Sequence, residues 1–209
     1  MARPQSPDYD KRRAAILAAA AQLYARRGFS GASVADLAKA CNTSKSLIYH
    51  YFPSKDDILY AAMAAHLDAL VAAAEEAARA GGAEARLRAL TRAFMRLYAG
   101  AQDSHKVLLN ELDNLPPARR AEVVAKQRRI IAAVEALVRE LRPESGPLTL
   151  PLTMLFFGMI NWTHTWFRPG GAVDADRLAD MAVELMLGGL GSPSLDSPPG
   201  KGRAIAYES

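Results

Sequence analysis

The stretch SVADLAKACNTSKSLIYHYFPSK, residues 33–55, constrains the fold of this chain more than any other part of its sequence. Ser33 has the side chain of a helix N-cap, and Asp36 follows it at the spacing of a capping box. Asn42, which tolerates a positive φ, interrupts the helical pattern. Ser44 can cap a second helix that ends before the one proline of the stretch, because a residue preceding proline avoids the helical region. The stretch therefore predicts two short helices joined by a tight turn.

Such a pair, with polar donors at the start of its second helix, is typical of a helix-turn-helix whose second helix lies in the DNA major groove. If Leu47 and Ile48 point inward, polar side chains remain on the outer face of the second helix. These side chains are Lys45, Ser46, Tyr49 and His50. The alternative is an ordinary pair of core helices, since helix pairs are common in helical proteins.

Positive charge gathers in the N-terminal quarter of the chain. The formal net charge of the 209 residues is +4. Residues 1–55 alone carry nine Lys and Arg against three acidic residues, a net of +6, so the remainder is slightly acidic. This distribution is typical of a small DNA-reading domain on a larger body, although a generic solvated basic face has the same composition. Residues 1–9 are expected to form a disordered arm, and basic side chains near it can reach DNA phosphates. These are Arg3, Lys11, Arg12 and Arg13.

Helical periodicity continues through the rest of the chain, and no alternating β-type run of useful length occurs. We expect helices near 10–27, 54–80, 84–100, 104–114, 117–141, 148–167 and 174–189, a loop at 143–147, and a disordered tail at 191–209. The predicted fold class is all-α, with about nine helices. Residues 1–53 would form the arm and the DNA-binding domain, and residues 54–190 a helical ligand-binding and dimerisation domain.

The last two helices carry more apolar surface than one small bundle needs. Phe157 and Ile160 fall on a different helical face from Leu155 and Met159. This pattern predicts a homodimer in which two helices of each chain form a four-helix bundle across a two-fold axis. The expected dimerisation residues are Phe157, Ile160, Leu178 and Leu185. The alternative is that these residues belong to the core of a single chain.

Catalytic and metal-binding patterns are missing from the sequence. The four histidines show no metal-ligand spacing, and there is neither a glycine-rich phosphate loop nor a cysteine pair. We therefore expect no enzymatic activity, no metal and no cofactor. Cys41 is the only cysteine, so an intramolecular disulfide cannot form and a reducing cytoplasm is expected. Without a signal peptide or a run of about 18 apolar residues, no membrane association is expected either.

Residues 12–59 resemble the N-terminal domain of the TetR/AcrR family of transcriptional regulators. The matching positions are Ile16, Leu17, Ala20, Leu23, Tyr24, Gly28, Phe29, Ser33, Val34, Leu37, Ala38, Ser44, Tyr49, Phe52, Lys55 and Leu59. In that family the positions of Tyr49 and Lys55 commonly anchor the DNA backbone. The residue pattern and the resemblance together give the expected DNA-binding residues. They are Arg12, Arg13, Ser33, Ser44, Lys45, Ser46, Tyr49, His50 and Lys55.

A second stretch, residues 156–190, is similar to the C-terminal region of TetR-type regulators of fatty-acid, steroid or aromatic-acid degradation. The similarity is carried by Asn161, Trp162, Trp166, Phe167, Arg168, Pro169 and Gly170. Several of those regulators respond to acyl-CoA thioesters, which need an apolar tunnel for the acyl group and cations for the phosphates. The expected ligand-binding residues are Phe94, Met95, Tyr98, Leu109, Leu112, Trp162, Trp166 and Arg168. The alternative is that both tryptophans are dimer contacts and Arg168 caps helix carbonyls.

The sequence therefore predicts a homodimeric repressor that binds double-stranded operator DNA and is released by a small-molecule inducer, an acyl-CoA thioester. Two alternatives stay open. One is a drug-sensing efflux regulator of the same family. The other is a helical protein-interaction module that does not bind DNA specifically.

Overall fold

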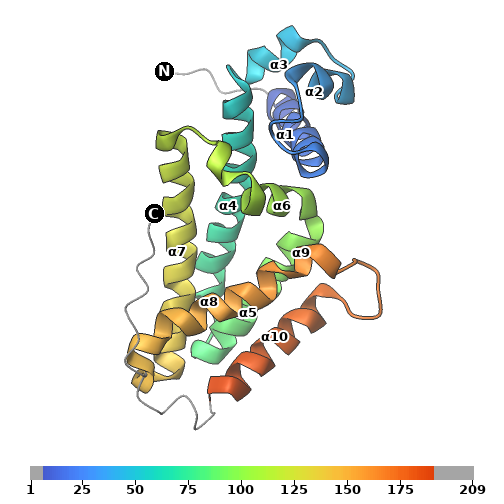
Figure 1. Cartoon of the computed structure of the whole chain (residues 1–209). Coiled ribbons are helices and arrows are strands. Elements are labelled where there is room, and N and C mark those ends of the chain that lie inside the picture. Colours follow the sequence, from blue (N-terminus) through green and yellow to red (C-terminus); the bar gives the residue numbers. More distant parts are fainter. Residues whose placement is uncertain (1–6, 191–209) are drawn as a thin grey trace.

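The computed structural model describes residues 7–190 (Figure 1). The first six residues, which include Arg3, and the expected tail at 191–209 lie outside the described part. Within residues 7–190 the regular elements are all helices, which confirms the predicted all-α class.

Three helices form one end of the molecule (Figure 1). They are α1 (Pro7–Arg27), α2 (Val34–Ala40) and α3 (Lys45–Tyr51). Their small core contains the buried side chains of Tyr24, Leu37 and Ile48. The expectation of a disordered arm up to residue 9 is wrong for residues 7–9, which form the first turn of α1. The ring of Tyr9 packs there against that of Tyr51, with centroids 4.5 Å apart.

The fourth helix, α4 (Lys55–Ala77), links this end to the rest of the chain and contacts α1, α5, α6 and α7. In length and composition α4 is apolar enough to cross a membrane, but more than half of its apolar stretch is buried against the other helices. Such burial is typical of the central helix of a globular protein. Ser54 caps α4 by accepting a hydrogen bond from the backbone N–H of Asp57 at 3.0 Å.

The larger body is built around α4. Its elements are α5 (Ala83–Gly100), α6 (Gln102–Asn110), the 3₁₀ helix η1 (Leu112–Asn114), α7 (Pro117–Leu141), the 3₁₀ helix η2 (Pro143–Leu148), α8 (Thr149–Asn161), α9 (Thr163–Trp166) and α10 (Ala175–Leu190). Two expectations need correction. The segment predicted as a loop at 143–147 is a 3₁₀ turn, and the helix predicted at 148–167 is broken at Trp162 into α8 and the short α9.

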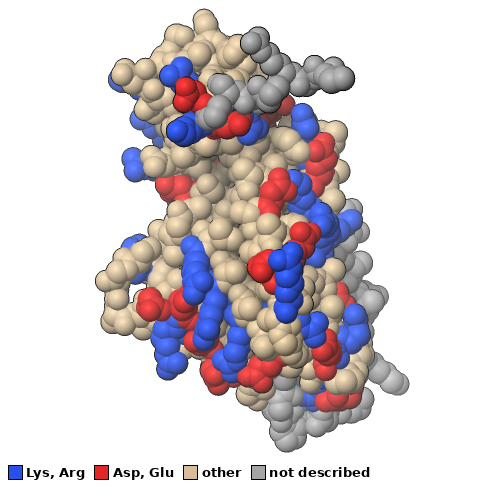
Figure 2. All heavy atoms as spheres, turned by 180° about the vertical axis from the view of Figure 1, so that it is seen from behind, with Lys and Arg blue, Asp and Glu red and all other residues tan. Residues whose placement is uncertain are grey.

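A ladder of ion pairs fixes α10 against α5. Arg88, Arg92 and Arg96 follow one another at helical spacing on α5, and each meets a carboxylate of α10. The partners are Glu184, Asp180 and Asp176 respectively. Figure 2 shows basic and acidic side chains interleaved over the lower part of one face of the molecule. Exposed pairs contribute little energy individually, but three in register favour one rotation of α10 about its axis.

The turn after α1 depends on Gly28, which has a φ of 72° in the left-handed region. Its backbone N–H donates to the carbonyl of Tyr24 at 2.9 Å and closes the C-terminal turn of the helix. The first helix therefore ends at Arg27, as expected from the sequence.

We expect Gly28→Ala to lower the free energy of unfolding by about 1–2 kcal/mol, because a Cβ disfavours the left-handed region. Gly100→Ala is the matched control, since Gly100 lies in a helix and a Cβ added there would meet nothing within 4 Å. Urea unfolding measures both variants. Equal destabilisation of the two would show that φ at Gly28 is not the cause.

Candidate nucleic-acid interface and ligand-binding region

The first helix of the helix-turn-helix is capped as the sequence predicts. Ser33 Oγ accepts from the backbone N–H of Asp36 at 3.1 Å, and Asp36 Oδ2 accepts from the backbone N–H of Ser33 at 3.0 Å. Hydrogen bonds from Ser33 hold the pKa of the Asp36 carboxyl below its ordinary value. After α2 the chain turns at Asn42, whose φ is 48°. The turn therefore uses the permissive residue identified in the sequence.

The second helix, α3, presents a polar face. Ser44 Oγ accepts from the backbone N–H of Leu47 at 3.2 Å and so caps the helix. Ile48 is fully buried, which fixes the rotation of α3 about its axis. The expected recognition residues Lys45, Ser46, Tyr49 and His50 are consequently all exposed, as are Ser33 and Ser44 at the two helix N-termini. A short helix held in this way can present its first turns to base edges in a major groove.

The remaining expected DNA contacts have different environments. Arg12 is exposed, whereas the guanidinium of Arg13 lies 5.1 Å from the centroid of the Phe52 ring. Lys55 Nζ donates to the carbonyl of Phe29 at 2.5 Å and lies 4.0 Å from the centroid of its ring. The ammonium of Lys55 therefore has partners inside the protein. This contact fastens the start of α4 to the turn after α1, so the expectation that Lys55 anchors a DNA phosphate is not supported.

The structure separates the expected ligand-binding residues into two groups. Phe94, Met95 and Tyr98 are buried together on the inner side of α5. Burial raises the pKa of the Tyr98 hydroxyl, which donates to Asn161 Oδ1 at 3.0 Å. Of the two leucines on α6 and η1, Leu112 is half-buried. Leu109 is exposed, because Val107 and Leu108 occupy the inward side of α6.

The other group lies on the outside. Trp162 is 65% exposed and Trp166 53% exposed, so neither lines an interior tunnel with Phe94. The prediction that Trp162 helps to line such a tunnel is wrong for this conformation. Arg168 is exposed and donates from Nη1 to the carbonyl of Phe167 at 3.1 Å. This bond matches the alternative in which Arg168 satisfies a carbonyl after the end of a helix.

The outer surface of α8, α9 and α10 is apolar. Its exposed side chains, which we call the α8–α10 face, are those of Leu155, Met159, Trp162, Trp166, Met181 and Leu185.

The buried stripe of α8 consists of Thr149, Thr153, Phe156, Phe157 and Ile160. The assignment of Phe157 and Ile160 to a dimer surface is therefore wrong, because both lie in the core of one chain. Leu155, on the other face of α8, is 68% exposed. Leu178 is half-buried, and Leu185 is 67% exposed as expected.

A buried polar cluster, which the sequence does not indicate, lies inside the helical body. His66 of α4 and His105 of α6 meet with Nε2 and Nδ1 3.2 Å apart, and the Tyr98 ring stacks on His105 with centroids 3.7 Å apart. His164 of α9 lies beside them, its ring centroid 6.1 Å from that of His105. Burial lowers the pKa of His66 to about 4 and that of His105 to about 3, so both are neutral near pH 7. No linear spacing could have revealed a cluster drawn from separate helices.

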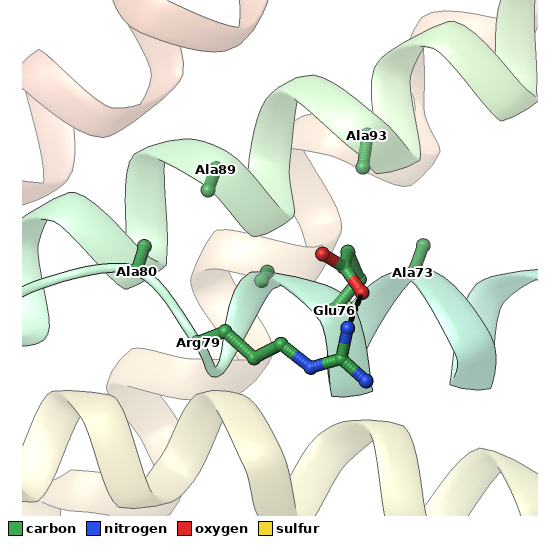
Figure 3. Close-up of a pocket in the computed structure, with 7 residues that line it drawn as sticks. Ala73, Glu76, Arg79, Ala80, Ala89 and Ala93 are labelled. Atoms are coloured by element: carbon green, nitrogen blue, oxygen red, sulfur yellow. Dashed lines mark hydrogen bonds and ion pairs between the residues drawn. The ribbon is translucent and has the colours of Figure 1, made fainter.

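An open groove lies between the end of α4 and α5 (Figure 3). Its volume is about 440 Å³, and it is lined by Ala73, Glu76, Ala77, Arg79, Ala80, Ala89 and Ala93. In Figure 3 the alanines of α4 and α5 face each other, and Arg79 pairs with Glu76 at 2.5 Å. The groove exists because methyl groups replace larger side chains on both helices. No spacing in the sequence indicates this groove, because alanines are common on every helix of the chain.

Two protein families match the chain. Residues 16–62 match the family described as bacterial regulatory proteins, tetR family, and residues 80–190 match a tetracyclin repressor-like C-terminal domain. Among characterised proteins, the transcriptional repressor KstR2 of Rhodococcus jostii is 28% identical over 189 residues. The match covers 87% of this chain and 92% of KstR2.

Solved structures agree with these matches. A TetR-family transcriptional regulator from Bordetella parapertussis is 40% identical, with a TM-score of 0.81 over 84% of this chain and 93% of that one. AibR, solved in complex with isovaleryl coenzyme A and operator DNA, is 26% identical. Its TM-score is 0.73, over 83% of this chain and 97% of AibR. The helix-turn-helix, the helical body and both family matches lead to one conclusion: this chain belongs to the TetR family of bacterial transcriptional regulators.

Proposed function

We propose that the protein is a transcriptional repressor that binds operator DNA through α3 and leaves it when a small-molecule inducer binds the helical body. The observation that carries this proposal is the capped, exposed α3, with four polar side chains directed outward from a buried Ile48. A module of this kind needs no catalytic step, no metal and no cofactor. It acts on chromosomal DNA, hence in the cytoplasm. Residues 1–53 would read the operator and residues 54–190 would bind ligand and partner.

Repression and release follow from the geometry of a dimer. Two copies of α3 related by a two-fold axis can read two half-sites only at a matching spacing. An inducer that binds better to another conformation of the body shifts the population towards it, and the half-sites are then no longer matched. The connection between the body and the DNA-reading end is α4, since it contacts helices of both.

A first prediction tests the DNA contacts. Tyr49, which is 50% exposed, has a hydroxyl that can meet a phosphate. Tyr49→Phe should weaken operator binding roughly tenfold while the thermal stability changes little.

If Lys45 reads a base edge, Lys45→Ala should reduce the free energy of binding to the operator by about 1–3 kcal/mol more than that of binding to unrelated DNA. Fluorescence anisotropy at several salt concentrations measures both. A fall in stability without a loss of affinity would place the Tyr49 hydroxyl in the core instead.

A second prediction concerns the dimer. We propose that the α8–α10 face is the homodimer interface, because so many large apolar side chains together are unusual on a monomer. Leu185→Glu should dissociate the dimer and abolish tight operator binding, since burying two unpaired charges costs on the order of several kcal/mol. Leu150→Glu is the matched control, because Leu150 is exposed on α8 but lies outside this face. Light scattering that finds Leu185→Glu still dimeric would move the interface elsewhere.

We also infer that the inducer is an acyl-CoA thioester. The support is the similarity to AibR, which was solved with isovaleryl coenzyme A, together with an apolar interior around Phe94 and Met95. Arg168, which is exposed after the end of α9, offers a planar fork for phosphate oxygens. The competing inducer is a drug-like molecule of an efflux regulator, for which the α4–α5 groove has a suitable volume. A helical interaction module remains the alternative if no operator is bound.

The third prediction tests this ligand class by calorimetry with acyl-CoA esters and the corresponding free acids, alongside operator release. The esters should bind and release DNA, and the acids should not. Arg168→Ala should weaken ester binding roughly tenfold and leave the operator affinity of the free protein unchanged, while Arg168→Lys should recover only part. Free acids that bind as tightly as the esters would refute the CoA assignment. Unchanged ester affinity in Arg168→Ala would refute the role of this arginine.

A further inference from the structure

Two buried side-chain nitrogens of the described residues have no hydrogen-bond partner, Arg120 Nε and His105 Nε2, and only the second belongs to a ring cluster inside the helical body. His105 is 1% exposed, and its Nδ1 already faces His66 Nε2 at 3.2 Å. Its other ring nitrogen, Nε2, is buried without a partner among the described residues. Buried polar atoms in native proteins are nearly always paired, because an unmade hydrogen bond leaves the cost of desolvation uncompensated. An unpaired nitrogen at this depth therefore suggests a position that a ligand atom completes.

The protonation state of His105 decides what that ligand atom can be. Both His66 and His105 are neutral near pH 7, since burial lowers both pKa values. In one arrangement His66 Nε2–H donates to the lone pair of His105 Nδ1, and the single proton of His105 then sits on Nε2. His105 Nε2–H becomes a donor directed at an uncharged acceptor. A carboxylate is less suitable, because no lysine or arginine belongs to the described cluster and a buried anion needs a paired charge.

The surroundings of the cluster are apolar on one side. The Phe94 ring lies 6.1 Å from that of Tyr98, and the Thr163 hydroxyl approaches the Met95 sulfur at 4.0 Å. A hydrogen-bonding group set beside such side chains is typical of sites that hold an apolar body and orient it by one polar atom.

The cluster lies under a short segment of the chain. Asn161 ends α8, and α9 consists of only four residues. This segment is held by local bonds, among them Thr163 Oγ1 to the Ile160 carbonyl at 2.6 Å and His164 Nδ1 with the Asn161 carbonyl at 2.7 Å. Two further bonds tie the segment to its neighbours, from the Tyr98 hydroxyl to Asn161 Oδ1 at 3.0 Å and from Gln102 Nε2 to the Phe167 carbonyl at 3.1 Å. An acyl group can reach His105 only if α9 moves away and these two bonds open.

We propose that His105 Nε2–H donates a hydrogen bond to the carbonyl oxygen of an acyl inducer, and that His66 is a positioning residue that holds the required tautomer. This inference rests on the proposed acyl ligand and names the atom that recognises it. The carbonyl accepts the bond, the acyl chain lies against Phe94 and Met95, and Tyr98 keeps the His105 ring in place by stacking on it.

Calorimetry tests this with isovaleryl-CoA and the thioether S-(3-methylbutyl)-CoA, in which a methylene replaces the carbonyl. The wild-type protein should prefer the ester by roughly tenfold to a hundredfold. His105→Phe should abolish the preference, and His105→Gln should restore part of it, since its amide nitrogen can donate from a similar position. Thr91→Val is the matched control. Thr91 is equally buried on α5, but its hydroxyl donates only to the Leu87 carbonyl, so the preference should persist.

A measurement on the wild-type protein covers the case in which His105→Phe does not fold. In ¹⁵N-resolved spectra of the histidine rings, the Nε2–H signal of His105 should shift with the ester and stay unchanged with the thioether. His66→Phe should weaken the preference for the ester, because the His105 tautomer is then no longer held. Equal binding of ester and thioether by the wild type would overturn the anchor while leaving acyl-CoA as the inducer.

A different result is expected if the inducer is not an acyl-CoA thioester. If neither CoA compound binds or releases the operator, acyl-CoA is not the inducer. The N-acetylcysteamine thioester and its thioether, which carry no phosphates, then replace the CoA pair. A preference for that thioester that disappears in His105→Phe would support the carbonyl anchor without CoA. Absence of any preference would overturn the anchor together with the ligand class.

Discussion

The burial of α4 is the constraint on which the rest of the structure depends. Its residues Ile58, Leu59, Met63 and Leu67 are almost completely removed from water, and the helix contacts neighbours at both ends of the molecule. Because packed interiors deform little, a displacement of α4 in the body must also move its N-terminal end. Lys55 joins that end to the turn after α1 through Phe29. The helix that forms the core therefore also connects the two functional regions.

Charged side chains on α7 hold the exposed side of α4. Arg119 pairs with Asp57 at 3.4 Å and lies over the ring of Tyr60, and Arg129 pairs with Glu75 at 3.0 Å near the other end of α4. The residue numbers of these pairs rise together, so the two helices run parallel. Exposed pairs of this kind contribute modest energy, but they restrict the direction in which α4 can move relative to α7. Asp57 also bonds the Ser54 cap, so α7 acts directly on the start of α4.

The break between α8 and α9 marks the point where side chains that pack in the apolar core give way to side chains with polar contacts. Before the break, α8 buries Phe156 and Phe157 and leaves Leu155 in solvent. At the break, Asn161 turns inward to Tyr98 while Trp162 turns outward. One short stretch thus supplies both a wall of the interior polar cluster and part of the α8–α10 face. A ligand that displaced α9 would alter both surfaces, which offers a physical route from ligand binding to dimer geometry.

Local signals in the sequence determined the helix-turn-helix and most helix ends. The caps at Ser33 and Ser44, the turn at Asn42 and the stop at Gly28 depend on residues within four positions of one another, so the pattern alone predicts them. These signals also placed the polar residues of α3 on its exposed face, because α3 has one strongly apolar side.

Only the tertiary structure decided which side of α8 is buried and which groups meet in the interior. Nearly every side of α8 is apolar, so periodicity could not tell Phe157 from Leu155. Their environments are set by contacts with α7 and α10. Lys55 was assigned to DNA because of the family resemblance at its position, whereas its partner Phe29 is distant along the chain. The meeting of His66, Tyr98, His105 and Asn161 depends on how four helices cross, and crossing angles are fixed by packing rather than by any local pattern.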